Sequence, residues 1–151
     1  MAILTYDLGS TGLKTALFDP TDGRLLALAE QEIPVQRPQP SWVEQDPDHW
    51  WQAVVATTRA VLAAAPKVMV QGIGLSTQRE TVVPVGPDGE VLRSAIMWMD
   101  RRALAEAREL GERLGADRIH RTPARALPPS TTNGRVCTTS CTSRWRGSTA
   151  G

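Results

Sequence analysis

The stretch "TYDLGSTGLKTALFD", Thr5 to Asp19, encloses two small hydroxyl residues between glycines, with an aspartate before them and a lysine after them. Backbone amides and hydroxyls in such a turn are able to converge on phosphate oxygens, and the lysine adds a positive charge. An aspartate at a strand end is suited to holding a hydrated Mg²⁺. The predicted phosphate and metal ligands are Asp7, Gly9, Ser10, Thr11 and Lys14. An ordinary Gly-Ser hairpin with a solvated lysine fits the same pattern.

This turn does not match two common glycine-rich phosphate motifs. A P-loop has four residues between its glycines and then Gly-Lys-Ser/Thr, whereas Gly9 and Gly12 are separated by two residues. The dinucleotide motif G-x-G-x-x-G fails here too, and "GIGLST", residues 72–77, has threonine where the third glycine belongs. The sequence therefore indicates neither a P-loop nor a dinucleotide-binding turn.

A second polar group lies in "STQRETVVPV", where Gln78, Arg79 and Glu80 stand between two apolar runs. The donor fork of an arginine and the acceptor oxygens of a carboxylate match the paired hydroxyls of a polyol. We therefore predict a substrate site for a sugar or polyol at these three residues. The alternative is a surface ion pair at the start of a strand.

A third segment, "AIMWMDRRA", ends an apolar run with Trp98 and continues with Asp100. The tryptophan has two plausible roles, one as the apolar wall of a sugar pocket and the other as a core residue beneath the following helix. The aspartate fits either the same pocket or the N-cap of that helix.

The elements that must position these residues follow from the apolar pattern. Residues 3–6, 15–18 and 25–29 are predicted strands joined by turns, which begin a meander. A helix is predicted from Pro47, with Asp46 as its N-cap, to Pro66. Its apolar face is predicted to comprise Trp50, Val54, Thr58, Val61 and Ala65.

After this helix, residues 70–75 read as a buried strand, and residues 81–85 and 95–98 as two more, with a tight turn at 86–89. A second helix follows Asp100, and its predicted face is lined by Ala103, Ala107, Leu110 and Leu114. Strands in a row followed by alternating strands and helices predict an α/β domain with a mixed sheet.

Taken together in this order, these segments resemble the FGGY carbohydrate kinase family, which includes glycerol kinase, xylulokinase and gluconokinase. "YDLGSTGLKTALFD" is similar to its first phosphate motif and "SWVEQDPDHWW" to its tryptophan and Asp-Pro helix start. "STQRETVVPV" resembles its substrate segment, and "AIMWMDRRA" the strand and helix that follow. The resemblance covers residues 1–121.

The resemblance implies an α/β, ribonuclease H-like (actin-type ATPase) fold, with a mixed sheet and flanking helices, incomplete in this chain. Two such domains would close over ATP and a sugar, whose hydroxyl attacks the γ-phosphate in the presence of Mg²⁺. Asp7 would lie near Mg²⁺, bound to it through water. The implied substrate-binding residues are Gln78, Arg79, Glu80, Trp98 and Asp100. The Gln-Arg-Glu triplet is similar to glycerol kinase, whereas "WVEQDPDHWW" is closer to the pentulose kinases.

Composition changes sharply near Thr122. Residues 122–151 contain no acidic residue and only Leu127 and Val136 as aliphatics, which predicts a polar, largely unstructured tail after a kinase portion at 1–121. This segment carries a charge of +4, so the first 121 residues carry −3 within the net +1 of the chain. Its two cysteines, Cys137 and Cys141, are too few for a metal site, which takes about four ligands.

The family's catalytic base is an aspartate beyond the matched region, and no acidic residue follows Asp117. We therefore expect no catalytic residue in this chain, which reads as a truncated and inactive front portion of a kinase. A reading-frame shift near Thr122 would produce the change in composition. The alternatives are a non-catalytic sugar- or polyol-binding fragment, a pseudoenzyme, and an unrelated α/β protein.

Bulk properties exclude several partners. The small net charge argues against nucleic acid and an anionic membrane. The N-terminus lacks a basic region and has Asp7 in its first apolar stretch, so neither a signal peptide nor a membrane span is predicted, and a cytoplasmic location is expected. The expected partner is a small sugar or polyol, and self-association of a full-length enzyme stays open.

Overall fold

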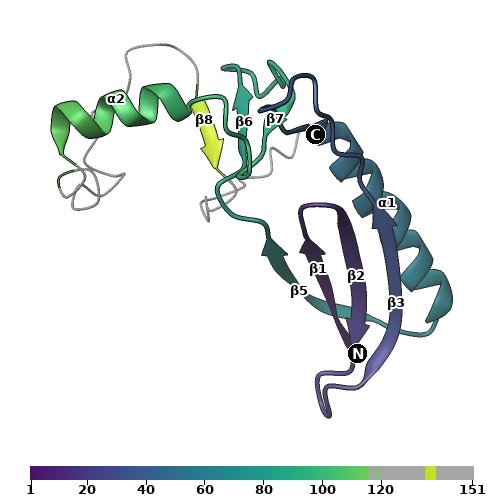
Figure 1. Cartoon of the computed structure of the whole chain (residues 1–151). Helices are drawn as coiled ribbons and strands as arrows, with labels where there is room; N and C mark the ends of the chain where they lie inside the picture. The colour runs from purple at the N-terminus through teal and green to yellow at the C-terminus, as the bar shows by residue number, and fades with distance from the viewer. Residues whose placement is uncertain (116–117, 119–134, 139–151) are drawn as a thin grey trace.

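The structure, a computed structural model, describes residues 1–115, 118 and 135–138. Its main sheet has the strand order β3-β2-β1-β5 (Figure 1). The strands are β1 (Ala2–Leu8), β2 (Gly12–Phe18), β3 (Leu25–Glu32) and β5 (Val70–Thr77). β1, β2 and β3 pair antiparallel in sequence, whereas β5 pairs parallel to β1. The predicted meander and mixed sheet are confirmed.

Helix α1 (Pro47–Ala64) connects the meander to β5 and packs against β2 and β3. Its start is as predicted, because Asp46 is the N-cap and its carboxylate accepts the N–H of Asp48 at 2.9 Å. The predicted face was only partly right, since the fully buried residues are Ala53, Thr57 and Val61. Small side chains at these positions let the helix lie close to the sheet, and the bulkier residues of the predicted face flank the contact.

The core lies between α1 and the sheet. One buried cluster consists of Ala2, Leu4, Leu17, Ala27 and Val61, and a second of Leu13, Ile33 and Ala53. A buried hydrogen bond of 2.7 Å joins the hydroxyls of Thr15 on β2 and Thr57 on α1. The two clusters fix α1 on the sheet, and with it the turn that follows β1.

Strand β5 was predicted to be buried, and this is wrong. Ile73 and Leu75 are 65% and 76% exposed. The reason is that α1 covers the β2 and β3 side of the sheet, while β5 lies at the opposite edge (Figure 1). Val70 at the start of the strand packs against the first buried cluster, whereas Ile73 and Leu75 face solvent.

A smaller antiparallel sheet has the order β4-β7-β6-β8. Its strands are β4 (Glu44–Gln45), β6 (Val82–Val85), β7 (Ala95–Ile96) and β8 (Arg135–Thr138). The predicted turn at 86–89 is confirmed, with Gly89 at φ +84° and its N–H donating to the Gly86 carbonyl at 3.1 Å. β8 lies within residues 122–151, the segment predicted to be largely unstructured, and its four residues pair with β6. The other residues of that segment, Cys141 among them, lie outside the described residues.

Helix α2 (Leu104–Leu114) has no buried residue, so its predicted apolar face is exposed in the described part of the chain. Its N-cap is Ala103, which makes no side-chain cap bond, and the alternative that Asp100 caps this helix is wrong. Neither α1 nor α2, the helices that the described residues form, combines the length and apolar character needed to cross a membrane.

Candidate functional site

The parallel pairing of β1 and β5 brings the first two polar segments together. In this register Asp7 lies beside Ser76, and Leu8 beside Thr77. The Gln78 N–H then donates to the Leu8 carbonyl at 2.7 Å, which ties the end of one strand to the start of the next loop. The carboxyl ends of parallel strands meet at one edge of a sheet, and ligands of α/β proteins bind at such edges.

The turn between β1 and β2 is held tightly. The Gly9 N–H donates to the Gly12 carbonyl, and the Ile33 N–H to the Thr11 carbonyl, both at 2.9 Å. A side chain at Gly12 would place its Cβ 2.8 Å from the backbone oxygen of Gln31, so only glycine allows β3 this close. The turn is therefore closed by backbone contacts on both sides.

A cavity of about 430 Å³, the Trp98 cavity, lies where these segments meet. It brings together seven of the predicted site residues from three segments of the chain: Asp7, Gly9, Ser10, Gln78, Arg79, Glu80 and Trp98. Leu8 and Thr77 complete the lining. Polar groups predominate around one apolar ring, an arrangement suited to a hydroxylated ligand.

Trp98 lines this cavity and is not a core residue. It is 54% exposed, which excludes the core role that the sequence left open. The indole N–H donates to the hydroxyl of Ser10 at 2.9 Å. The segment after β7 is thereby attached to the turn after β1.

Glu80 has φ +61°, and it is the only non-glycine residue of the described chain with a positive φ. This left-handed conformation costs a residue with a side chain about 1–2 kcal/mol. Strain of this kind persists where surrounding structure enforces it, and it gathers at ligand sites. At Glu80 it turns the chain between β5 and β6, in the wall of the Trp98 cavity.

A smaller neighbouring cavity of about 260 Å³, the Lys14 cavity, holds the other two predicted phosphate ligands, Thr11 and Lys14. Asp7 and Gly9 line both cavities, so the two adjoin along the turn. The Lys14 ammonium lies 3.5 Å from a carboxylate oxygen of Glu30, and both side chains are exposed. Such a surface pair contributes at most about 1 kcal/mol, which leaves the ammonium free to exchange partners.

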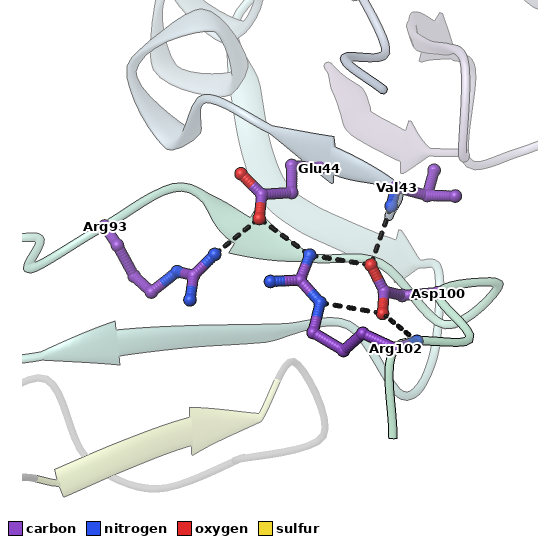
Figure 2. A network of polar contacts seen from close by, with 5 residues as sticks. All are labelled: Val43, Glu44, Arg93, Asp100 and Arg102. Atoms are coloured by element: carbon purple, nitrogen blue, oxygen red, sulfur yellow. Dashed lines mark hydrogen bonds and ion pairs between the residues drawn. The ribbon is translucent and has the colours of Figure 1, made fainter. Parts of the chain in front are cut away.

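Asp100 is not among the residues that line either cavity. Figure 2 shows its carboxylate accepting the Val43 N–H, at 2.7 Å, and both the backbone and the side chain of Arg102. Arg102 also donates to Glu44 at 2.7 Å, and Arg93 contacts the same carboxylate. The structure thus places Asp100 in a network that joins β4 to the segment after β7.

The electrostatics of this network follow from its geometry. The pKa of Asp100 is well below its usual range, chiefly because the Arg102 side chain donates to it; burial acts in the opposite direction. The backbone N–H groups of Arg102 and Val43 lower it further. The pKa of Arg102 is raised, chiefly by its side-chain hydrogen bond to Asp100. Burial opposes this shift, and the hydrogen bond to Glu44 adds to it. Both side chains are therefore ionised at neutral pH.

Gln45 on β4 lines neither cavity, but it contacts two residues of the Trp98 cavity, Ser10 and Gln78, and sequence reasoning missed it. It is fully buried, and its carboxamide contacts the turn after β1, α1 and the segment after β5. The only signal in the sequence was its place in "WVEQDP", immediately before the helix. A buried glutamine beside a cavity indicates a hydrogen-bonding role, because a buried carboxamide must find partners.

Comparison with known proteins gives a consistent result. The sequence profile described as "FGGY family of carbohydrate kinases, N-terminal domain" matches residues 2–135. A glycerol kinase of Delftia acidovorans is 38% identical over 122 residues, which are 79% of this chain and 24% of that protein. A xylulose kinase of Klebsiella pneumoniae is 34% identical over 112 residues, 74% of this chain and 23% of that protein.

Solved structures agree. A xylulose kinase from Brucella ovis superimposes with a TM-score of 0.71 at 37% identity, covering 75% of this chain and 24% of that one. The xylulose kinase from Rhodospirillum rubrum gives 0.73 at 26% identity, covering 78% and 25%. The chain therefore spans about a quarter of the length of the relatives that it matches. The predicted ribonuclease H-like, actin-type fold with an incomplete mixed sheet is confirmed.

Proposed function

The chain belongs to the FGGY family of carbohydrate kinases, and on this basis we propose that it forms the sugar- and phosphate-binding front of a kinase. The reaction is transfer of the γ-phosphoryl group of ATP to a hydroxyl of a sugar or polyol. The observation that carries the proposal is the Trp98 cavity, which is lined by both the predicted phosphate turn and the predicted substrate segment.

In this reaction a substrate hydroxyl oxygen forms a bond to the γ-phosphorus while the bond from that phosphorus to the bridging oxygen breaks. ADP leaves, and the hydroxyl proton passes to a base. Arg79 and Glu80 would hold vicinal hydroxyls of the substrate against Trp98, and the Gly9 to Gly12 turn would receive the phosphates. Positioning and charge stabilisation account for most of the catalysis in such a transfer.

Asp7 fits the magnesium ion that phosphoryl transfer uses. No group of three or more ligating residues gathers within the described ranges, so a dedicated protein cage is not found there. Mg²⁺ commonly keeps several waters and is held by one or two carboxylates together with phosphate oxygens. A single exposed carboxylate that lines both cavities suits this mode. When bound, the ion neutralises charge on the phosphates.

Residues 1–121 are proposed to be the front of the first kinase domain and residues 122–151 a polar tail. The base that accepts the hydroxyl proton is then supplied outside residues 1–121. The relatives named as glycerol kinases and as a xylulose kinase support a sugar or polyol as the substrate class. The second candidate is sugar or polyol binding without catalysis, for which the residues that line the Trp98 cavity would suffice.

The test measures ligand binding and turnover separately. The 151-residue chain is titrated with glycerol, xylulose and gluconate by thermal unfolding, where a ligand at a hundred times its Kd adds about 2.7 kcal/mol. ATP consumption is then measured for this chain and for a chimera that continues from residue 121 into the Delftia acidovorans glycerol kinase. Binding by the chain and turnover only by the chimera support the kinase proposal. Binding without turnover in either supports the binding fragment, and no binding contradicts both.

Glu80 offers a sharper test, because its strain and its proposed ligand contact can be separated. Glu80→Gly relieves the left-handed backbone and should raise the free energy of unfolding by about 1 kcal/mol, while removing the carboxylate. Glu80→Gln keeps the strain and removes only the charge. If Glu80 binds hydroxyls, both variants lose affinity for the polyol, although only the glycine variant is more stable. Unchanged affinity in both would remove Glu80 from the site.

A further inference from the structure

Gln45 connects the segments that form the Trp98 cavity. Its carboxamide nitrogen donates to the Ser10 carbonyl at 3.0 Å and to the Ile33 carbonyl at 3.4 Å. Its carboxamide oxygen accepts from the Trp50 indole at 3.1 Å and from the Gln78 side chain at 3.4 Å. We infer that Gln45 is a positioning residue that sets the distance between the phosphate turn and the substrate segment.

The orientation of this carboxamide is fixed by chemistry. The Trp50 indole is only a donor, so the oxygen of Gln45 must face it. The carbonyls of Ser10 and Ile33 are only acceptors, so the nitrogen must face them. Because Gln45 is fully buried, water does not replace any of these partners. A flipped or shortened side chain would leave buried polar groups unpaired, which is costly.

Two chains of contacts run from Gln45 to the cavity. In one, Gln45 holds the Ser10 backbone, and the Ser10 hydroxyl accepts the Trp98 indole N–H at 2.9 Å. In the other, Gln45 accepts from the Gln78 side chain, while the Gln78 backbone is tied to Leu8 at 2.7 Å. The phosphate turn and the substrate segment, which line the cavity, are therefore both held by the buried Gln45 carboxamide.

Backbone pairing fixes Gln45 itself. It lies on β4, where it pairs with Ala95 of β7, and α1 begins two residues later. The preceding residue, Glu44, is held by Arg93 and Arg102 (Figure 2). The carboxamide is thus presented from a rigid element, as positioning of other residues requires.

The first experiment needs no ligand and therefore does not depend on the proposed function. The chain has five tryptophans, which give five indole N–H signals in a ¹⁵N–¹H spectrum, assigned by single Trp→Phe changes. Gln45→Met keeps the side-chain length and removes its hydrogen bonds. We expect the Trp50 signal to shift through direct contact, and the Trp98 signal to shift and exchange several-fold faster through Ser10. Gln52→Met, at an exposed position of α1, is the control and should leave both signals in place.

A shift of Trp50 alone, with Trp98 unchanged in position and exchange rate, would overturn the inference. Gln45→Glu provides a second variant that does not depend on how well the methionine variant folds. Its carboxylate accepts hydrogen bonds but cannot donate to the two carbonyls, and burial raises the pKa of the introduced carboxyl. Once protonated it has one O–H donor and an acceptor oxygen, so it is again able to donate to one of the two carbonyls, whereas the carboxamide donates to both. The Trp98 signal should return toward its wild-type position as pH falls, while wild type over the same range stays constant. No return would contradict positioning by the donor.

The second experiment rests on the proposed function and measures glycerol and xylulose affinity by titration. We expect Gln45→Met to weaken polyol binding at least tenfold, with Gln52→Met unchanged. Equal affinity in Gln45→Met and wild type would overturn a role in the site. If wild type binds no polyol while Trp98 responds to Gln45, the proposed substrate class fails and the positioning role stands.

Discussion

Replacing Arg102 by methionine should remove much of the stability of the chain. The Arg102 guanidinium donates to Asp100 at 2.8 and 2.7 Å and to Glu44 at 2.7 Å, and it lies 3.9 Å from the centroid of the Trp42 ring. The side chains of Arg102, Asp100 and Glu44 are only 17%, 4% and 8% exposed. The substitution would leave two carboxylates close together, out of water and short of their main partner.

The expected loss is about 3 kcal/mol. Removing one partner of a buried ion pair typically costs about 3–5 kcal/mol, and the lower end applies because Arg93 continues to contact Glu44. Folded domains have about 5–15 kcal/mol in total, so the loss is readily measured. Urea unfolding monitored by tryptophan fluorescence gives the difference. The control is Arg113→Met, which breaks an exposed pair with Glu109 on α2 and should cost about 0.5 kcal/mol or less.

The pH dependence of the free energy of unfolding, compared between wild type and Arg102→Met, tests this reasoning. In wild type the pKa of Asp100 is lowered, so its contribution is present above the unfolded value of about 3.9 and is lost as pH falls through the folded pKa. In Arg102→Met the largest lowering effect is lost, and burial is opposed only by the Val43 N–H and the backbone N–H at position 102, so we expect the folded pKa of Asp100 to rise above that value. That variant should therefore gain stability as pH falls from 7 toward 4. A loss below about 1 kcal/mol, or acid destabilisation parallel to wild type, would refute the reasoning.

Three further predictions concern backbone, core and surface. Gly12→Ala should lower the free energy of unfolding in urea by about 1–3 kcal/mol, because the added Cβ meets the backbone of β3. Gly111→Ala on α2, where the Cβ meets open space, should raise it by about 1 kcal/mol. Equal effects of the two substitutions would contradict this prediction. Thr57→Val should cost about 1–3 kcal/mol by leaving the buried Thr15 hydroxyl without its partner, and the double change with Thr15→Val should recover most of that loss in a double-mutant cycle. Leu75→Thr, at an exposed position of β5, should raise the solubility limit while changing the free energy of unfolding by less than about 0.5 kcal/mol. Aggregation is measured by light scattering, and unchanged aggregation in this variant would show that the exposed β5 surface does not limit solubility.

Much of the fold could be predicted from local patterns. The apolar runs and turn residues gave the meander, and Asp46 and Pro47 gave the start of α1, because these signals act within a few residues. The burial of β5 could not be judged in this way. An apolar strand reads as buried whether or not another layer covers it, and Ile73 and Leu75 are exposed because no described element packs on them.

Residues of the candidate site were predictable when their own chemistry marked them. Arg79 and Glu80 between apolar strands, and the hydroxyls in the turn, stand out because such groups do not serve a core. Asp100 stood out for the same reason, yet its carboxylate is taken up by Arg102 and Val43. Residue type alone does not distinguish a carboxylate that faces a ligand from one that holds two segments together.

The same limit explains why Gln45 was missed. Its inferred positioning role follows from the way the cavity is built. A cavity built from loops keeps its shape only if those loops are fixed to something rigid. The turn containing Ser10 and the segment containing Gln78 are 68 residues apart in sequence, and the first contacts the nitrogen of the Gln45 carboxamide while the second contacts its oxygen. A carboxamide carries two N–H donors on one terminal atom and an acceptor oxygen on the other, so it can hold two such segments without burying a charge. Gln45→Met removes both the donor and the acceptor, whereas Gln45→Glu removes only the donor, which is why the two variants should fail in different ways.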